Sequence, residues 1–298
     1  MIELLSYARE RLPDWLELTR IDKPVGIGLL LWPTLWALWL AAEGLPPPDL
    51  LAIFLLGVVL TRSAGCVVND YADRDFDGHV ERTRARPIPD GRVKPHEALS
   101  IAAVLMGLAF FLVLLTDRLT IMLAFIAAGL AVLYPFTKRM THMPQLFLGM
   151  AFSMAIPMAF SAVTGRVPNV AWLLFVGNLL WTVAYDTEYA MVDRPWDRKV
   201  GIKSTAILFG EQDRLIIGIL QLAFVACLTM VGTRLELGAA WYAGVVGAAG
   251  VLGWQQWLIR DRDLDACFKA FRANNLVGLI VFVGAAADYA FAALSAPS

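Results

Sequence analysis

The chain has 298 residues, of which 58% are hydrophobic, with a net charge of −1 and a mean hydropathy of +0.62. Soluble domains are roughly 45–50% apolar, so this composition indicates an integral membrane protein and excludes an ordinary soluble domain. The near-zero net charge gives no indication of a nucleic-acid partner. The three cysteines have neither paired nor metal-ligand spacing, which argues against a disulfide framework or a zinc site.

Residues 1–23 mix charged side chains with leucine and tryptophan, and they lack the apolar stretch of a signal peptide. The apolar side chains, including Leu12, Trp15 and Leu16, fit an amphipathic helix lying on the membrane surface. A solvated helix is an equal alternative. We predict that this segment is a cytoplasmic lead-in to the first span.

Nine windows of about 17–25 mostly apolar residues follow, which is the length of a helix that crosses a bilayer. They lie near residues 24–42, 50–70, 97–116, 119–137, 144–164, 169–187, 214–232, 238–258 and 275–294. We therefore predict an all-α fold, a multi-pass membrane bundle of about nine transmembrane helices. Residues 1–298 are expected to form a single domain.

The basic residues are strongly asymmetric about these windows. Of the 25 Lys and Arg, 21 fall on the side that carries the N-terminus. The positive-inside rule then places the N-terminus in the cytoplasm and the C-terminus outside. The two longest loops, near 71–96 and 188–213, are predicted to be cytoplasmic. Long loops in a compact protein often serve as lids or binding segments.

An acidic stretch leaves the second apolar window, where residues 69–77 read N-D-Y-A-D-R-D-F-D. At about 100° per residue, Asp70, Asp73 and Asp77 lie within roughly 60° on one helix face. Asp75 points to the far side. Carboxylates on one face repel each other unless a cation lies among them. Their oxygens suit a hard cation such as Mg²⁺ or Ca²⁺.

A second acidic stretch leaves the sixth window, where residues 181–197 read W-T-V-A-Y-D-T-E-Y-A-M-V-D-R-P-W-D. Asp186, Tyr189, Asp193 and Asp197 share a face within about 80°. Pro195 makes a regular helix doubtful at that point. Either acidic face alone is ordinarily a solvated surface. Two of them at corresponding ends of two apolar segments suggest a weak internal duplication with a site between the halves.

Basic side chains accompany both acidic stretches. Arg86, Lys138 and Lys203 lie at the same predicted end, where carboxylates and cations together suit a metal-bridged polyanion such as a diphosphate. Arg62 lies inside the second span, where an unpaired charge costs at least roughly 2.5 kcal/mol. It requires an anionic partner, which is either a carboxylate on another helix or the carboxylate of a substrate.

The two acidic stretches resemble the paired aspartate motifs of the UbiA superfamily of intramembrane prenyltransferases. The flanks R-I-D-K-P-V-G-I-G-L-L-L-W-P-T-L-W-A-L-W, R-S-A-G-C-V-V and G-I-K-S-T-A-I-L-F-G are similar to its bacterial members that prenylate 4-hydroxybenzoate. The likeness runs from about residue 20 to 290, and Pro195-Trp196 departs from it. It implies Mg²⁺-dependent transfer of a polyprenyl group from a polyprenyl diphosphate to the 4-hydroxybenzoate carbon ortho to the hydroxyl. It also implies a role in ubiquinone biosynthesis in the bacterial inner membrane.

The resemblance carries roles onto individual positions. The metal ligands that it implies are Asn69, Asp70, Asp73, Asp77, Asp186, Asp193 and Asp197. The catalytic residues among them are expected to be Asp73, Asp77, Asp193 and Asp197. The substrate contacts that it implies are Arg62, Asn69, Arg86, Tyr134, Lys138, Tyr189 and Lys203. Within this last set, Arg62 falls where the family contacts the aromatic substrate, and the other cations fall where it binds diphosphate.

Three alternatives remain at this point. One is a related enzyme with another acceptor, such as homogentisate, a naphthoate or haem, against which Arg62 discriminates only weakly. Another is a cation-coupled transporter, which would place acidic or broken helices near the bilayer midplane. The aspartates here lie at the predicted cytoplasmic edge. The third, a receptor or scaffold, would have no need of carboxylates at metal-binding spacing.

Overall fold

The computed structural model describes residues 2–78 and 83–295, and it describes side chains from residue 10 onward except those of 76 and 77. Within these ranges the chain is helical and contains no strand, which confirms the all-α prediction. The helices are α1 (Ile2–Thr19), α2 (Val25–Ala42), α3 (Pro48–Asp77), α4 (Pro95–Val113), α5 (Arg118–Met140), α6 (Pro144–Ser153), α7 (Ala155–Thr164), α8 (Asn169–Val200), α9 (Thr205–Phe209), α10 (Asp213–Arg234), α11 (Ala239–Leu258) and α12 (Leu264–Ser295), with short 3₁₀ turns η1 (Gly210–Gln212) and η2 (Ile259–Asp261).

Each predicted window coincides with one of the long helices, and the window 144–164 corresponds to α6 and α7 together. In the described part of the chain, eight helical segments are long and apolar enough to cross a membrane. The segment that falls short is α11, which is long enough but includes several glycines together with Gln255 and Gln256. The chain is therefore a multi-pass membrane protein.

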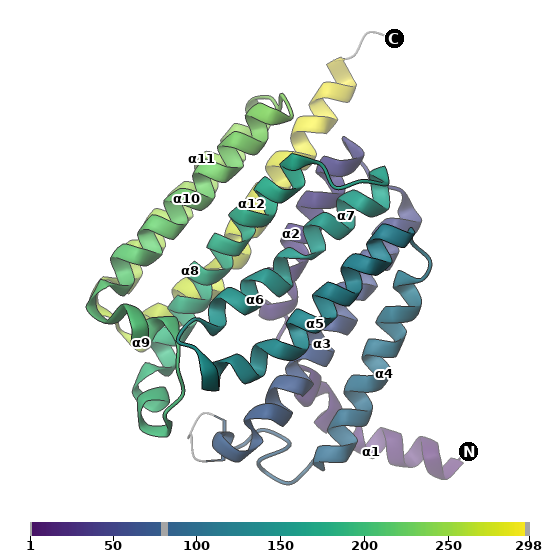
Figure 1. The fold of residues 1–298 in the computed structure, drawn as a ribbon, viewed down its shortest axis with the longest axis vertical. Coiled ribbons are helices and arrows are strands. Elements are labelled where there is room, and N and C mark those ends of the chain that lie inside the picture. The colour runs from purple at the N-terminus through teal and green to yellow at the C-terminus, as the bar shows by residue number, and fades with distance from the viewer. Residues whose placement is uncertain (1, 79–82, 296–298) are drawn as a thin grey trace.

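The long helices run side by side, oblique to the long axis of the molecule, and the two termini lie at opposite ends (Figure 1). Helix α1 lies across the end at which α3 and α8 extend beyond their apolar windows, to Asp77 and Val200. The doubt about helix at Pro195 was wrong, because α8 continues through it. A proline removes the hydrogen bond to the carbonyl four residues earlier, here Met191, and its ring crowds that carbonyl, but α8 remains helical there.

One membrane segment is interrupted. Helix α6 ends at Ser153 and α7 begins at Ala155, with Met154 between them. Pro157 explains the break, because it has no N–H to donate to the Ser153 carbonyl and its ring crowds that carbonyl. The interruption lies against the central cavity described below.

Stacked aromatic rings form the buried centre of the bundle. Trp181 of α8 stacks on Phe224 of α10 with ring centroids 5.4 Å apart, and Trp36 of α2 lies 5.3 Å from Trp181. The Trp36 indole N–H donates to the Gly278 carbonyl at 2.9 Å. The Trp181 N–H donates to Asn274 Oδ1 at 2.8 Å. These contacts bury large apolar area and satisfy both indole donors, so they hold α2, α8, α10 and α12 together.

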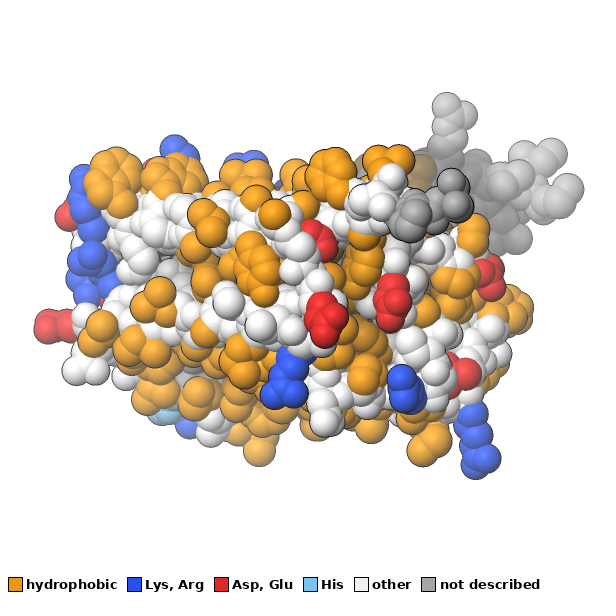
Figure 2. All heavy atoms as spheres, turned by 90° about the horizontal axis from the view of Figure 1, so that it is seen from above, with side chains coloured by type: hydrophobic (Ala, Val, Ile, Leu, Met, Phe, Trp, Pro, Cys, Tyr) orange, Lys and Arg blue, Asp and Glu red, His pale blue; other side chains and the backbone are white. Residues whose placement is uncertain are grey.

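The outer surface is largely apolar. Phe111 on α4, Met122 on α5 and Leu222 on α10 are 62%, 57% and 72% exposed. Exposure on this scale is unfavourable in water and is expected for side chains that face lipid. Figure 2 looks onto the end of the bundle at which α12 ends, where hydrophobic side chains predominate and charged ones are scattered.

A polar cluster lies inside the bundle between α8, α10 and α12. The Glu188 side chain is fully buried and accepts hydrogen bonds from Asn274 Nδ2 at 3.0 Å and Gln221 Nε2 at 3.3 Å. Gln221 also donates to Gln255 Oε1 at 3.1 Å. No Lys or Arg in the described residues forms an ion pair with Glu188. A neutral side chain with the same hydrogen bonds would therefore suit this position.

This cluster predicts a contrast between two variants. Glu188→Gln should lower the thermal unfolding temperature of the purified protein less than Glu188→Leu does, because it keeps one of the two oxygens that accept hydrogen bonds. Glu188→Leu should destabilise the protein by about 1–3 kcal/mol for each buried donor that it leaves without an acceptor. Equal destabilisation by the two variants would show that both oxygens of the carboxyl group are needed.

Candidate active site

A cavity of about 910 Å³ opens among helices α2 to α8, with α12 at its margin. Its walls near α4 and α5 are apolar and include Phe110, Val113, Phe125 and Val132. At the end near α1 it is lined instead by charged side chains. The described Lys and Arg residues that line it are Arg20, Lys23, Arg62, Arg86, Lys138 and Lys203, and the acidic ones are Glu17, Asp73, Asp186, Asp193 and Asp197. The cavity therefore joins an apolar chamber to a polar end.

The ends of α3 and α8 bring most of the predicted carboxylates into this one cavity. Asn69 and Asp73 face it from α3, four residues apart and hence on one helix face. Asp186, Asp193 and Asp197 face it from α8, where the unbroken helix keeps them on one side. The two acidic stretches, more than 100 residues apart in sequence, thus share a single site.

Lys138 on α5 connects to the α3 face. Its ammonium group donates to Asn69 Oδ1 and to Asp73 Oδ2, both at 2.9 Å, and it lies 5.5 Å from the centroid of the Tyr134 ring. Arg139 anchors the same end of α5 by donating to the Ala72 carbonyl at 2.6 Å. A cation from a third helix thus offsets the negative charge of Asp73.

Lys203 enters the cavity from the segment between α8 and α9. Its backbone N–H donates to the Lys138 carbonyl at 3.1 Å, so the two lysines are neighbours. Tyr189 on α8 also lines the cavity, and its ring lies 4.9 Å from that of Phe271 on α12. The predicted contacts Tyr134, Lys138, Tyr189 and Lys203 therefore gather at the polar end.

Two of the predicted ligands stand apart from this group. Asp70 does not line the cavity, and its carboxylate accepts hydrogen bonds from Arg20 and from Arg86 Nη1, the latter at 3.1 Å. Asp77 is the last residue of α3, and its side chain is outside the described part of the structure. Asp75, on the opposite face, is 68% exposed, as helical periodicity predicts.

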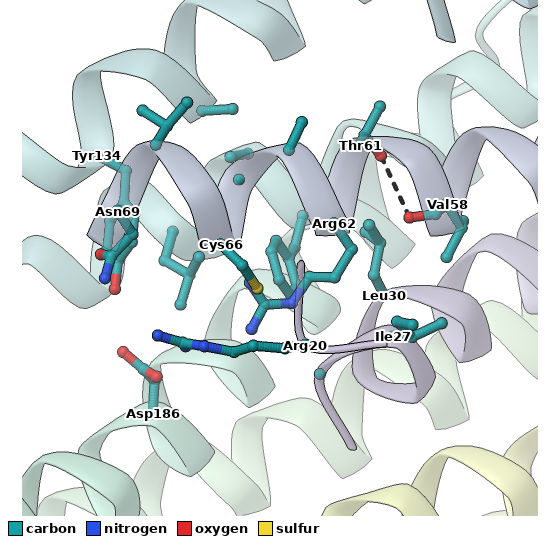
Figure 3. A pocket seen from close by; sticks show the side chains of 18 of the residues that line it. Arg20, Ile27, Leu30, Val58, Thr61, Arg62, Cys66, Asn69, Tyr134 and Asp186 are labelled. Carbon is teal, nitrogen blue, oxygen red and sulfur yellow. Dashed lines mark hydrogen bonds between the residues drawn. The ribbon is translucent and has the colours of Figure 1, made fainter. Parts of the chain in front are cut away.

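Arg62 lies within α3 and projects into the middle of the cavity (Figure 3). Its Nε is buried and has no hydrogen-bond partner, and the guanidinium carbon lies 5.7 Å from the centroid of the Phe152 ring. No carboxylate of the described residues forms an ion pair with it. Gly26 on α2 makes room for this side chain, because a Cβ there would lie 2.5 Å from Arg62 Nη2.

Arg20, Lys23 and Thr83 line the cavity but were not among the predicted site residues. The Arg20 side chain extends toward Asp186, and Asn69 lies nearby (Figure 3). The only sequence signal for Arg20 was its place in the basic cluster before the first span. Basic residues also cluster on the cytoplasmic side of membrane proteins for topology alone, so the cluster could not identify Arg20 as a site residue.

The oxygen donors at the polar end of the cavity are of the kind that bind magnesium. Asn69, Asp73, Asp186, Asp193 and Asp197 offer oxygen atoms to one space, and Mg²⁺ prefers oxygen ligands. In the described residues, however, no three acidic, histidine or cysteine side chains are close enough to form a metal site by themselves. Since protein-bound Mg²⁺ commonly uses one or two carboxylates and completes its shell with phosphate oxygens and water, this arrangement suits a metal that arrives with a phosphate.

Proteins of known sequence resemble this chain over nearly its whole length. It is 55% identical over 290 residues to the 4-hydroxybenzoate octaprenyltransferase of Pseudomonas syringae, covering 97% of this chain and 98% of that protein. It is 58% identical to the enzyme of the same name from Aeromonas salmonicida, over 94% of this chain and 97% of the relative. For the Klebsiella pneumoniae enzyme the identity is 57%, over 95% and 99%.

Solved structures share the fold. The apo structure of a UbiA homologue from Aeropyrum pernix superposes with a TM-score of 0.78 at 24% identity, over 88% of this chain and 97% of that one. A UbiA homologue from Archaeoglobus fulgidus bound to GPP and Mg²⁺ superposes with a TM-score of 0.69 at 15% identity, over 93% and 99%. The profile of the UbiA prenyltransferase family matches residues 30–279. The chain belongs to the UbiA prenyltransferase family.

Proposed function

We propose that this protein is an aromatic polyprenyltransferase of the bacterial inner membrane. It transfers a polyprenyl group from a polyprenyl diphosphate to the ring carbon ortho to the hydroxyl of 4-hydroxybenzoate, a step of ubiquinone biosynthesis. Relatives named 4-hydroxybenzoate octaprenyltransferase are 54–58% identical to this chain over almost its full length. The observation that carries the proposal is the single cavity that joins paired acidic helix ends, several cations and an apolar chamber.

The donor substrate matches the two ends of the cavity. Its diphosphate would lie at the polar end, where Lys138, Arg86 and Lys203 offer positive charge and charge-assisted hydrogen bonds. Its hydrocarbon chain would lie along the apolar walls of α4 and α5. Asn69, Asp73, Asp186, Asp193 and Asp197 would hold Mg²⁺ on the diphosphate, with Asp77 as a further ligand. When bound, Mg²⁺ supplies electrostatic stabilisation of the leaving diphosphate.

Arg62 supports an acidic acceptor. A guanidinium group without a carboxylate partner among the described residues is costly in an apolar bundle. The carboxylate of 4-hydroxybenzoate would supply that partner and fix the ring inside the cavity. The aromatic ring of Phe152 beside Arg62 offers an apolar surface for the acceptor ring.

The proposed reaction has three steps, which are loss of the diphosphate, formation of the new C–C bond and loss of a ring proton. The allylic C–O bond breaks and the diphosphate leaves with the bonding electrons, while the apolar walls exclude water from the developing allylic cation. The ring carbon ortho to the hydroxyl forms the new C–C bond. The proton that this carbon loses passes to a carboxylate at the polar end or to the released diphosphate.

The orientation of the protein in the membrane is part of the proposal. The positive-inside rule supports a cytoplasmic N-terminus, a cytoplasmic polar end of the cavity and an external C-terminus. The two termini at opposite ends of the bundle agree with that arrangement (Figure 1). The chain is proposed to act as one domain over its full length.

The first test is turnover by the purified protein. With Mg²⁺, a short prenyl diphosphate and a panel of aromatic acceptors, we expect the mass of prenylated 4-hydroxybenzoate, and loss of the product when EDTA removes the metal. Product from homogentisate or a naphthoate in its place would reassign the acceptor. Product formed equally well in EDTA would remove magnesium from the proposal.

Substitutions at the two acidic faces test the carboxylates. Asp73→Ala and Asp193→Ala should abolish turnover, because each removes an oxygen donor from the shared cavity. Asp75→Ala is the matched control on α3, since that side chain is exposed on the opposite face, and it should retain activity. Each variant is first checked for membrane insertion. Activity in either of the first two variants would contradict the proposed ligand set.

Arg62 is tested by separating the two substrates. Arg62→Ala should raise the KM for 4-hydroxybenzoate by about tenfold or more, the scale of a lost charge-assisted hydrogen bond, with a much smaller change for the prenyl diphosphate. Gly26→Ala should act in the same direction, because the new Cβ displaces the guanidinium. Gly107→Ala on α4, where a Cβ meets no atom within 4 Å, is the control. Equal effects on both substrates would make Arg62 a structural residue.

A further inference from the structure

Asp70 belongs to the first acidic motif but, unlike Asn69 and Asp73, its side chain does not line the cavity. Its side chain is almost fully buried, and one oxygen, Oδ1, accepts hydrogen bonds from both Arg20 and Arg86. The two arginines line the cavity, whereas Asp70 does not. The carboxylate therefore lies behind the two cations.

Arg20 reaches this position through an unusual backbone conformation. Helix α1 ends at Thr19, and Arg20 has a φ of 54°, in the left-handed region that favours glycine. Its N–H donates to the Glu17 carbonyl at 3.1 Å, and its own carbonyl accepts from the Lys23 N–H at 3.1 Å. The tight turn directs the side chain into the cavity, toward Asp186 (Figure 3). A left-handed residue directly after a helix is a common way to end it, and Glu43 and Arg262 do the same elsewhere in the chain.

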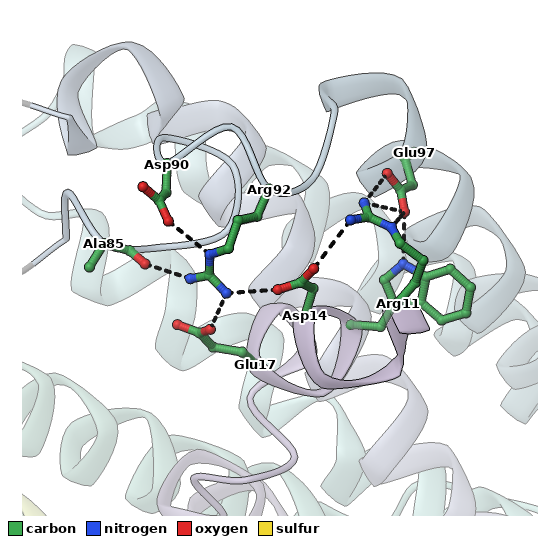
Figure 4. Close-up of polar contacts among 8 residues, drawn as sticks. Arg11, Asp14, Glu17, Ala85, Asp90, Arg92 and Glu97 are labelled. Atoms are coloured by element: carbon green, nitrogen blue, oxygen red, sulfur yellow. Dashed lines mark hydrogen bonds and ion pairs between the residues drawn. The ribbon is translucent and has the colours of Figure 1, made fainter. Parts of the chain in front are cut away.

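Arg92 fastens α1 to the loop that carries Arg86 (Figure 4). Its guanidinium donates to Asp14 at 2.8 Å and Glu17 at 2.7 Å on α1, and to the Ala85 carbonyl at 2.8 Å in the loop. Hydrogen bonds to carboxylates, above all that of Glu17, raise the pKa of Arg92 above its ordinary value, so it stays charged at any physiological pH. Arg20 and Arg86 thus belong to two elements that are held together at the margin of the cavity, which Glu17 and Ala85 also line.

A second contact fixes the other side of α1. Arg11 donates to both oxygens of Glu97 on α4, at 2.9 and 2.7 Å, and the Trp15 indole N–H donates to Glu97 Oε1 at 2.8 Å (Figure 4). The end of α1 is therefore anchored on α4 and on the loop before α4. This anchoring leaves Arg20 at the rim of the polar end as part of an ordered structure.

We propose that Asp70 is a positioning residue, not a metal ligand, and that it holds Arg20 and Arg86 as a pair of phosphate-binding cations. Arg20, from the N-terminal segment, thereby becomes a diphosphate contact of the site. The inference rests on the proposed function for the identity of the diphosphate substrate. A guanidinium fork matches phosphate oxygens in geometry, and a buried carboxylate that orients two of them prepares the site before the anion arrives.

The test measures binding of inorganic pyrophosphate to the purified full-length protein by calorimetry, with and without Mg²⁺. Arg20→Gln should raise the Kd of pyrophosphate by about tenfold or more in both conditions, and Arg20→Lys should recover part of the loss. Asp70→Asn should also weaken binding, but the factor by which Mg²⁺ tightens it should match the wild type. In Asp73→Asn that factor should fall toward one.

Arg11→Gln is the matched control, because it removes an arginine–carboxylate pair from the same helix but outside the cavity. It should raise the Kd of pyrophosphate much less than Arg20→Gln does, because Trp15 still donates to Glu97 and Arg92 still joins α1 to the loop. An equal loss in this variant would show that the effect comes from anchoring α1, and would overturn the role of Arg20. A lost Mg²⁺ factor in Asp70→Asn would return Asp70 to the metal ligands. Should Asp70→Asn fail to fold, the two Arg20 variants decide the inference.

Turnover of the wild-type protein separates this inference from the proposed function. If prenylated 4-hydroxybenzoate forms but Arg20→Gln binds pyrophosphate as the wild type does, only the inference fails. If the pyrophosphate results are as expected but no acceptor is prenylated, the anion site stands and the acceptor chemistry of the proposed function fails.

Discussion

Carboxylates from two helix ends share one cavity, and their mutual repulsion must be offset before the bundle can hold them there. The cations that offset it come from other elements. Lys138 of α5 donates a hydrogen bond to Asp73. Arg20 of the N-terminal segment and Arg86 of the loop before α4 both donate to Asp70. Cations from α5, from the N-terminal segment and from the loop before α4 thus meet at the carboxylates of the α3 end.

The membrane helices and the acidic faces were predictable because both are periodic features of the local sequence. Apolar length located the spans, and helical rotation correctly placed Asp75 on the exposed side. The same rotation placed Asp70 within roughly 60° of Asp73, yet the two carboxylates have different partners. Rotation about a helix axis gives the direction of a side chain. It does not give the partner that arrives from a segment 50 residues away, as Arg20 does.

Prolines were a poor guide to where helices end. Pro195 lies inside α8, whereas Pro157 lies next to the junction of α6 and α7. At that junction Met154 keeps helical torsion angles, its N–H donates to the Met150 carbonyl and its own carbonyl accepts from the Met158 N–H. A proline removes one hydrogen bond and crowds one carbonyl in either case, so the local sequence predicted a disturbance of the helix but not its extent.

The position of the helix break bears on the transport alternative. A cation-coupled transporter uses broken helices whose exposed backbone and acidic groups bind the ion near the membrane centre. Here the break between α6 and α7 lies beside Phe152, Ala155 and Met158, which contribute apolar wall to the cavity. The carboxylates instead gather where α3 and α8 leave their apolar windows. A cavity that is apolar at the break and charged at the helix ends suits a lipid with a charged head, which must be held at one end and sheltered along the rest.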